Sequence, residues 1–391
     1  MDDSSIAAQS TPAPSAPAPR RRRRWLKRLL YLAYLAIVLE IGLQSFYFFT
    51  VGQWLPSRVN VPMYAPNEHS EYFNKANLSI PHNSNEFQTM IYTNGQGLRT
   101  SAEAADYPLG KQPGKKRILL LGPSFAFGWG VKYEQTFAAQ LEEMLRDSAE
   151  FGSDVEVINA GVPSLGLVQG LNWYRHVGKK FEPDLVIQFN TGSMNVDSSG
   201  RWNNVEINEQ GYLIRKDATA KQRLIGYAKN SALVYYGWQA VTRIMSLFHQ
   251  PKPGDKIEGA GREMELHEAF QPDNPEVLDS MKYYEDLRST VELSGAKLLV
   301  LFMPMSYCVH EQDISRWAHL DTVDIERQNQ YNAAFCRHLQ SVGFDCLDVT
   351  DDSKQAAAGG QRLYYFIDIH WTPEGNQVAA RAAARHLKEP P

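Results

Sequence analysis

Short apolar runs alternate with amphipathic helical patterns over the last two thirds of the chain. The runs with β character are Ile118–Leu121, Val155–Ile158, Leu185–Phe189, Lys297–Phe302 and Asp345–Val349. The segments with helical periodicity between and after them are Thr136–Arg146, Gln169–Val177, Pro275–Ser294, Ile325–Val342 and Pro373–Leu387. Continuous apolar strands that alternate with helices are typical of a parallel sheet covered on both faces. The pattern predicts a three-layer α/β/α domain over residues 116–391, with a mainly parallel sheet of about five strands.

Two stretches depart from this alternation. Residues 52–115 contain Pro56, Pro62, Pro66 and Pro81 and show no helical period, so they are interpreted as an extended lead-in. Residues 197–273 interrupt the domain as an insertion. Within it, residues 227–248 are rich in aromatic residues and helical in pattern. We expect this insertion to lie near the site and to shape substrate access.

The N-terminal pattern predicts a membrane anchor. Residues 1–28 combine a Pro/Ala tract with seven Lys/Arg and two Asp, and they are expected to be disordered. Residues 29–51 are then apolar over about the length that spans a bilayer. No small-residue cleavage site follows, which favours an uncleaved signal anchor over a signal peptide. The positive-inside rule keeps the basic tail in the cytoplasm and sends the domain across the membrane. A buried helix of a soluble protein is the alternative.

Charge and cysteine content refine this picture. The formal charge is −4, and the N-terminal 28 residues carry +5, so the remainder carries −9. An acidic body argues against nucleic acid as a partner. Glu40 stands inside the apolar segment, where it either marks a contact with another membrane helix or is tolerated as the neutral acid. Cys336 and Cys346 could bridge a helix to the next strand in an exported domain, or remain buried thiols.

Ser124 stands on a glycine-flanked turn directly after the first predicted strand. Gly122 precedes it, and Gly128 and Gly130 follow it. In doubly wound sheets, functional groups collect at the carboxyl ends of strands. Ser124 is therefore a candidate nucleophile, and the alternative is an ordinary capping or turn serine.

His370 lies two residues after Asp368, just before a Thr-Pro helix start near the C-terminus. A serine hydroxyl needs a base that takes its proton, and the base needs a third group that fixes its tautomer. His370 and Asp368 are the candidates for these two roles. Asp348 and Asp351, at the end of the fifth predicted strand, are weaker rivals for the acid.

Candidate oxyanion donors follow the second and third predicted strands. The N–H of Gly161 can face the same cavity, and Asn190 and Asn195 offer side-chain amides. Donors that converge on one point form an oxyanion hole, in which one donor is typically worth about 3 kcal/mol. Turn chemistry is the alternative for Asn159 and Asn190.

These segments together resemble the SGNH/GDSL hydrolase superfamily, from about residue 92 to the C-terminus. The matching blocks are Gly122-x-Ser124 with Phe127-Gly128-Trp129-Gly130, Asn159 to Pro163, loosely Gly192 to Asn195, and Asp368 to Gly375. The resemblance implies a flavodoxin-like SGNH fold that needs no metal or organic cofactor. It also implies Ser124 as nucleophile, His370 as base and Asp368 as its orienter. The implied oxyanion donors are the N–H of Ser124, the N–H of Gly161 and the side chain of Asn195.

The lead-in strengthens the membrane assignment. Residues 92–99 look like the segment before the first block in membrane-anchored bacterial members. The resemblance therefore implies a single-pass protein of the bacterial inner membrane, with its N-terminus in the cytoplasm and its catalytic domain in the periplasm.

The sequence departs from the family pattern at three points. Pro123 replaces the Asp of Gly-Asp-Ser, and the third block lacks a clean Gly-x-Asn-Asp, so Asn190 competes with Asn195. The acid precedes His370 by two residues, where most members have three. The resulting Asp-x-His-Trp is similar to alginate-acetyltransferase-type domains, which move acetyl groups onto exopolysaccharide.

The sequence thus predicts a membrane-anchored serine esterase that acts on an O-acyl ester, with a carbohydrate ester as the expected substrate. One alternative is an O-acetyltransferase of exopolysaccharide modification that uses the same three residues. The other is a non-catalytic carbohydrate-binding relative, motivated by the lost Asp of the first block and the blurred third block.

Overall fold

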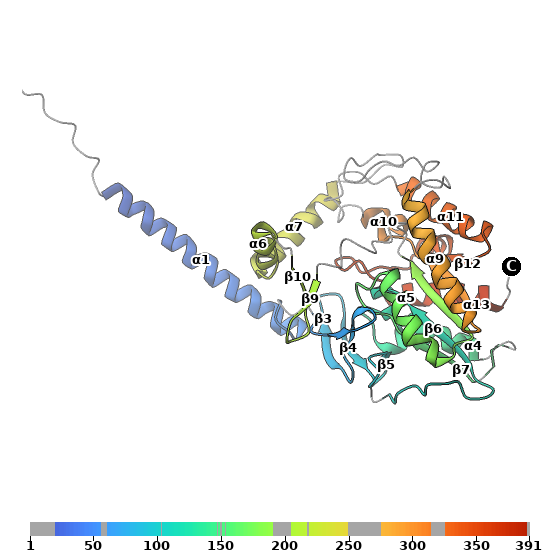
Figure 1. The fold of residues 1–391 in the computed structure, drawn as a ribbon. Helices are drawn as coiled ribbons and strands as arrows, with labels where there is room; N and C mark the ends of the chain where they lie inside the picture. The colour runs from blue at the N-terminus through green and yellow to red at the C-terminus, as the bar shows by residue number, and fades with distance from the viewer. Residues whose placement is uncertain are drawn as a thin grey trace, which may run out of the picture.

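The computed structural model describes residues 20–55, 61–102, 104–146, 148, 151–152, 154–190, 205–216, 219–248, 275–313 and 325–388. A long helix, α1 (Arg20–Val51), leads into a domain in which helices flank a twisted sheet (Figure 1). Residues 1–19, which hold the Pro/Ala tract, lie outside the described residues.

The sheet contains the five predicted parallel strands. They are β6 (Lys116–Leu121), β7 (Val155–Asn159), β8 (Leu185–Asn190), β11 (Lys297–Phe302) and β12 (Asp345–Asp348). Their spatial order is β12-β11-β8-β6-β7, with parallel pairing throughout. The first strand in the chain therefore lies between the second and third, which is the flavodoxin-like order. The expected α/β class is confirmed, and the strand order agrees with the flavodoxin-like fold that the resemblance implies.

The lead-in extends this sheet, which the sequence pattern did not reveal. Beyond β7 lie the antiparallel strands β5 (Arg99–Thr100), β4 (Gln88–Thr93) and β3 (Ser79–Asn83), so the described sheet has eight strands. Pro81 lies in β3, the edge strand, where a missing N–H is tolerated. The strands β1 (Tyr64–Asn67) and β2 (Glu71–Asn74) form a separate hairpin. The strands of the lead-in are short and two of them contain a proline, so the sequence shows no clear alternation of apolar and polar residues there.

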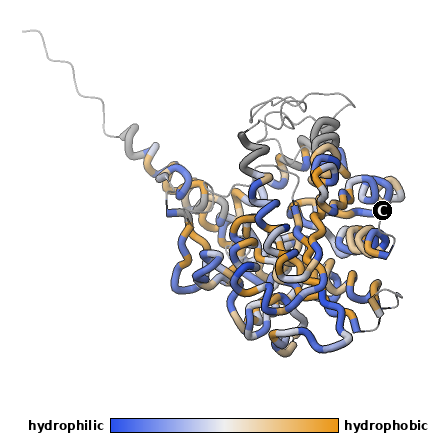
Figure 2. Tube along the Cα trace, turned by 45° about the vertical axis from the view of Figure 1, so that its right-hand side comes forward, coloured by the Kyte–Doolittle hydropathy of each residue, from blue (hydrophilic) through white to orange (hydrophobic). Residues whose placement is uncertain are grey.

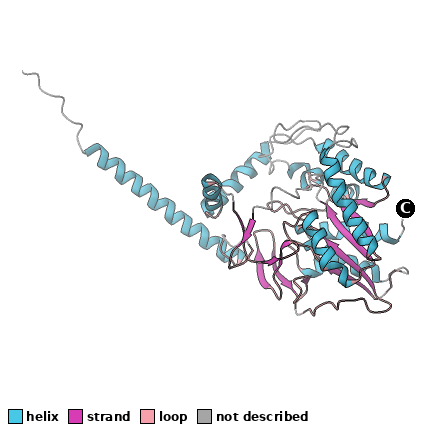
Figure 3. Cartoon of the chain, in the orientation of Figure 1, coloured by secondary structure: helices cyan, strands magenta, loops and turns pink. Residues whose placement is uncertain are grey.

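Helices cover both faces of the sheet, as the alternation predicts (Figure 3). One face packs against α5 (Leu167–His176), α9 (Pro275–Leu293) and α11 (Ile325–Ser341). The other face packs against α4 (Phe137–Arg146) and α13 (Pro373–Lys388), with α12 (Thr350–Ala358) against α13. Neighbouring strand residues take opposite faces: Leu119 belongs to the first core and Leu120 to the second. Two single-turn helices are α3 (Ser124–Phe127) and α10 (Ser306–Val309).

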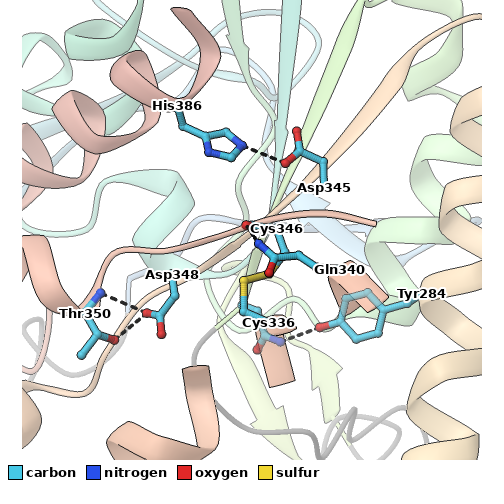
Figure 4. Close-up of a disulfide and its surroundings, with 9 residues drawn as sticks. Tyr284, Cys336, Gln340, Asp345, Cys346, Asp348, Thr350 and His386 are labelled. Atoms are coloured by element: carbon cyan, nitrogen blue, oxygen red, sulfur yellow. Dashed lines mark hydrogen bonds and ion pairs between the residues drawn. A yellow bond between two sulfur atoms is a disulfide. The ribbon is translucent and has the colours of Figure 1, made fainter. Parts of the chain in front are cut away.

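A disulfide joins Cys336 in α11 to Cys346 in β12 (Figure 4). The two Cα atoms are 5.6 Å apart. Gln340, one turn after Cys336, donates a hydrogen bond to the carbonyl of Cys346 at 3.0 Å. The bridged alternative is therefore the one realised, and Cys308 is the free, buried cysteine.

The insertion forms a small hairpin and two helices where the structure describes it. The elements are β9 (Val205–Ile207), β10 (Leu213–Arg215), α6 (Ala220–Lys229) and α7 (Ala232–Phe248). The helical prediction over residues 227–248 is confirmed for α7 and the end of α6. Residues 191–204 and 249–274 lie outside the described residues.

The helix α1 is long and apolar enough over Arg24–Val51 to cross a membrane. Hydrophobic residues run along it (Figure 2), and most of its large apolar side chains are exposed. The alternative, a core helix of a soluble domain, is not supported because such a helix would be buried.

Candidate active site

The turn after β6 places Ser124 at the carboxyl end of the central strand. Gly122 has φ +144°, and a Cβ there would lie 2.6 Å from the Cβ of Phe189. Only glycine fits that position. Ser124 then opens the single turn of α3, which ends at Gly128 in the left-handed conformation (φ +81°). Because β6 lies where the strand order reverses, Ser124 occupies the topological switch point of the sheet.

His370 comes from the loop between α12 and α13. Its carbonyl accepts a hydrogen bond from the N–H of Tyr365 at 3.0 Å, which closes this loop on itself. Thr372 caps α13 through a hydrogen bond from the N–H of Gly375 at 3.2 Å, as the Thr-Pro signature predicts. The ring of Phe125 packs 4.8 Å from the imidazole, centroid to centroid. These contacts fix the ring in front of α3.

Ser124, His370 and Asp368 form one hydrogen-bonded chain. The Nε2 of His370 lies 2.6 Å from the Oγ of Ser124. The Nδ1 of His370 contacts Oδ1 of Asp368, which also accepts the backbone N–H of His370 at 3.0 Å. With Nδ1 protonated toward the carboxylate, Nε2 is free to accept the serine proton. The expected proximity of Ser124 and His370 is observed.

Asp368 is held as a carboxylate. Burial alone would raise its pKa, but the neighbouring His370 ring and its hydrogen bonds outweigh burial and lower the pKa to about 2. The carboxylate is therefore ionised at neutral pH, as is needed to stabilise an imidazolium on His370.

Glu86 is a residue of the site that sequence reasoning missed. It lies in the loop between β3 and β4, 282 residues before Asp368. Asp368 and His370 belong to the loop between α12 and α13, which is called the triad loop. Its Oε2 accepts the N–H of Ile367 at 2.8 Å and the N–H of Asp368 at 2.7 Å. Ser84 orders the same loop by accepting the N–H of Glu86 at 3.1 Å. No signal in the lead-in sequence distinguishes Glu86 from the other carboxylates of the chain.

A cavity of about 230 Å³ lies beside the triad. Its walls come from His82 and residues 84–87 of the lead-in, from Trp129, from the loop that holds Asp368 and His370, and from Tyr235 in α7. His82 is buried in this wall and packs 4.1 Å from Trp129, centroid to centroid. Burial lowers the pKa of His82 to about 3, so its ring is neutral. The expectation that the insertion lies near the site holds for Tyr235.

The predicted oxyanion donors stand as follows. Gly161 packs against α3, because a Cβ there would lie 2.3 Å from the backbone nitrogen of Phe127. Its N–H donates to Oδ1 of Asn159 at 3.0 Å, so Asn159 performs the turn chemistry given as its alternative role. Asn190 donates its side-chain amide to the hydroxyl of Tyr284 in α9 and is thereby engaged away from the triad. Asn195 lies outside the described residues.

The rival acids are placed elsewhere. Oδ1 of Asp348 accepts the backbone N–H and the hydroxyl of Thr350, so this carboxylate serves the start of α12. Asp351 is exposed in the first turn of α12. Asp368 is therefore the carboxylate that reaches His370.

Residues 263–391 match the family model of the "SGNH hydrolase-like domain, acetyltransferase AlgX". The match identifies an SGNH hydrolase-like domain, similar to that of AlgX. The matched segment holds Asp368 and His370, whereas Ser124 lies before it and joins them only through the fold. The expected recognition, an SGNH-type domain with similarity to alginate acetyltransferases, is confirmed.

A curated relative agrees with this assignment. The chain is 26% identical to the "Probable alginate O-acetylase AlgJ" of Azotobacter vinelandii over 146 aligned residues. The aligned segment covers 37% of this chain. The chain spans 36%, about a third, of the length of that curated relative.

Solved structures similar to this chain include an aryl esterase of M. smegmatis and a catalytic mutant of Axe2, an acetylxylan esterase from Geobacillus stearothermophilus. The first is 15% identical, with 70% of this chain and 98% of that chain covered and a TM-score of 0.35. The second is 13% identical, with 70% and 94% covered and a TM-score of 0.36. Scores this low do not place the SGNH-like domain with either enzyme.

Proposed function

We propose that Ser124, His370 and Asp368 act as a catalytic triad, and that this chain is a membrane-anchored enzyme acting on O-acyl esters of carbohydrates. The observation that carries the proposal is the 2.6 Å separation between Ser124 Oγ and His370 Nε2, with Asp368 on the other ring nitrogen. A non-catalytic relative has no need to keep this alignment, so the geometry weighs against the carbohydrate-binding alternative.

The chemistry follows from the hydrogen-bonded chain. Ser124 Oγ attacks the ester carbonyl while His370 Nε2 takes the serine proton, and Asp368 stabilises the resulting imidazolium. Collapse of the tetrahedral intermediate breaks the ester bond, and His370 returns the proton to the departing alcohol. The acyl group then remains on Ser124. We keep Gly161 and Asn195 as proposed oxyanion donors. The N–H of Gly161 donates to Asn159 Oδ1, so to bind the oxyanion it must either break this hydrogen bond or donate to both acceptors at once.

Two acceptors can resolve the acyl-enzyme. Attack by water gives an esterase, and attack by a sugar hydroxyl gives an O-acetyltransferase; in both, His370 takes the proton of the incoming hydroxyl. The match to an acetyltransferase family model, together with the Asp-x-His-Trp spacing, favours transfer to a carbohydrate as the second candidate function.

Covalent labelling tests the shared first step. A fluorophosphonate probe should label the full-length protein, and Ser124→Ala should abolish the label. Ser341→Ala, at an exposed serine of α11 outside the site, is the control and should label as wild type does. Equal labelling of Ser124→Ala and wild type would show that Ser124 is not the nucleophile.

Product partition separates the two acceptors. Wild-type protein that reacts with the probe is incubated with a chromogenic acetyl ester and saturating oligosaccharide. The acetate and the acetylated sugar are both quantified. Transfer predicts that acetylated sugar rises at the expense of acetate. Release of acetate alone at saturating sugar assigns the protein as an esterase.

We further propose that the basic tail stays in the cytoplasm and the triad faces the periplasm of a bacterial inner membrane. The support is the run of five arginines at the start of α1, since each charge costs a few kcal/mol at the membrane centre. A C-terminal alkaline phosphatase fusion should be active and a C-terminal green fluorescent protein fusion dark. The reverse pair of results would place the triad in the cytoplasm.

A further inference from the structure

Glu40 in α1 caps the first turn of α7. Its carboxylate oxygens accept the N–H of Ala232 at 2.8 Å, the N–H of Leu233 at 2.9 Å and the hydroxyl of Ser231 at 2.8 Å. Gln44, one turn further along α1, donates to the same carboxylate at 2.9 Å. The positive end of a helix dipole stabilises an anion. The acidic residue within the apolar part of α1 is thus satisfied by the insertion of its own chain.

An aromatic seam continues this contact. The ring of Tyr47 meets that of Tyr235 edge-on at 5.8 Å, and the ring of Phe46 lies 6.1 Å from that of Tyr236. Tyr47 and Tyr235 are buried in this seam. The helices α1 and α7 are therefore packed together at one end, and α7 then leads away from α1 rather than running alongside it (Figure 1).

The other side of α7 is an exposed apolar face. The side chains that form it are Leu233 (39% exposed), Val234 (45%), Trp238 (51%), Val241 (55%) and Ile244 (54%). At 100° per residue they fall within an arc of about 140°. The neighbouring α6 adds Leu224 and Ile225, which are also exposed. A contiguous apolar face of this kind on a helix indicates a binding surface.

The position of Glu40 along α1 sets the depth of this face. Glu40 lies twelve residues after Arg28, the last basic residue before the apolar segment. At 1.5 Å per residue this is about 18 Å, which is inside a hydrocarbon layer of about 30 Å when α1 stands upright. An α7 tied to Glu40 therefore begins at or below the lipid surface on the far side from Arg28.

We infer that α6 and α7 form a second membrane-embedded element, with their exposed apolar face in the lipid of the leaflet that the C-terminal half of α1 crosses. Lipid is the occupant because the face begins at Leu233, whose N–H bonds Glu40, the chain neighbour of the exposed Ile41 in α1. In addition, the polar start of α7 is satisfied by Glu40 without water. This contact is independent of the chemistry at Ser124.

The membrane contact places the triad cavity at the lipid surface. A second cavity, of about 470 Å³, lies between Phe46 and Val51 of α1, Tyr236 of α7 and the loop of residues 84–88. It shares residues 84–87 with the triad cavity. Asn85 in this shared wall donates to the hydroxyl of Tyr235 at 2.9 Å. An ester substrate would thus enter beside the bilayer rather than from bulk water.

Site-directed quenching in nanodiscs tests the inference. Single cysteines at Trp238→Cys and Val241→Cys carry an environment-sensitive fluorophore in the full-length protein, with one copy per disc of phosphatidylethanolamine and phosphatidylglycerol. Leu293→Cys is the matched control, because Leu293 is an equally apolar, 89% exposed residue at the end of α9. The native cysteines do not compete, since two are bridged and Cys308 is buried.

Lipid-attached doxyl groups should quench the labels at positions 238 and 241, and iodide in water should quench them at least about threefold less than the label at position 293. Labels at 238 and 241 that iodide reaches as readily as position 293 would overturn the inference. Shielding from iodide without doxyl quenching would also overturn it, because protein and not lipid would then cover the face. Unchanged thermal melting of each variant establishes that the fold is intact.

Discussion

The carboxylate of Glu86 holds the backbone N–H of Asp368 at 2.7 Å. Through this bond, a loop of the antiparallel extension fixes the acid of the proposed triad. The same oxygen accepts the N–H of Ile367, so two consecutive backbone groups of the triad loop depend on one side chain. Both hydrogen bonds act on the backbone next to the acid, and we therefore interpret Glu86 as a positioning residue.

Replacing Glu86 should loosen the triad loop. In Glu86→Ala, two backbone N–H groups lose a charged acceptor worth about 1.5–3 kcal/mol per bond, so we expect fluorophosphonate labelling to slow by roughly 10- to 100-fold. Glu86→Gln keeps an acceptor oxygen and should lose less. Labelling rates and thermal melting of the three proteins check this. Identical rates for Glu86→Ala and wild type would remove Glu86 from the site.

The carboxylate of Asp368 should set both reactivity and acid stability. Asp368→Asn changes the tautomer that His370 presents to Ser124, and we expect labelling to fall by about 10³- to 10⁴-fold. The pKa of Asp368 is lowered from 3.8 to about 2 on folding, by the His370 contacts that outweigh burial. This shift corresponds to about 2 kcal/mol of stability.

The sign of the effect fixes the pH window. Because the folded pKa lies below the unfolded one, the contribution is complete above about pH 4 and is lost as the pH falls toward 2. Urea unfolding between pH 2 and 6 should show this loss in wild type and not in Asp368→Asn. Asp348→Asn is the control, since burial raises the pKa of Asp348 and its titration acts in the opposite direction. An acid-dependent loss of equal size in Asp368→Asn would contradict the assignment.

The sequence predicted the parallel half of the sheet because buried strands read as continuous apolar runs. Lys297–Phe302 was predicted with its observed bounds, and the other four strands within two residues. The same pattern failed for β3 to β5, which are short, antiparallel and interrupted by Pro81. These strands join the sheet through β5, which pairs with β7 far along the chain, and no local period encodes that pairing.

The candidate site divides in the same way. Ser124, Asp368 and His370 lie in local motifs with recognisable turn and helix-start residues, and the fold brings them together. Glu86 and Tyr235 reach the cavity only through tertiary contacts, so their residue type alone carried no signal. Glu40 was only partly predictable. A carboxylate inside an apolar segment is energetically costly, which marked Glu40 as unusual, but only the structure shows that the start of α7 is its partner.

Reduction of the Cys336–Cys346 bridge should destabilise the domain. The two cysteines are separated by 10 positions, and closing a loop of this size is worth roughly 2–3 kcal/mol. The double variant Cys336→Ser with Cys346→Ser should melt at lower temperature than wild type. Reductant should lower the melting temperature of wild type and of Cys308→Ser but leave the double variant unchanged. A wild-type melting temperature indifferent to reductant would argue against the bridge.

Alkylation distinguishes the three cysteines directly. Burial raises the pKa of the Cys308 thiol to about 12, so it should resist alkylation in the folded protein and react after unfolding without reductant. Cys336 and Cys346 should react only after unfolding and reduction. Mass spectrometry of the alkylated peptides reads both steps. Since disulfides persist outside the reducing cytoplasm, a bridged pair in protein taken from cells would also support the periplasmic placement.

Gly161 should tolerate no side chain, because it packs against the backbone of the turn that presents Ser124. A Cβ at this position would lie 2.3 Å from the nitrogen of Phe127 and 2.7 Å from the carbonyl carbon of Ala126. Backbone atoms cannot yield as a side chain does, so Gly161→Ala must displace α3. We expect a loss of about 1–3 kcal/mol in stability and at least a tenfold loss of labelling. Gly237→Ala in α7, where a Cβ meets nothing within 4 Å, should leave labelling intact and stabilise its helix by up to about 1 kcal/mol. If Gly161→Ala labels at the wild-type rate, then the position of α3 is not set by this contact, and Gly161 has no part in presenting Ser124.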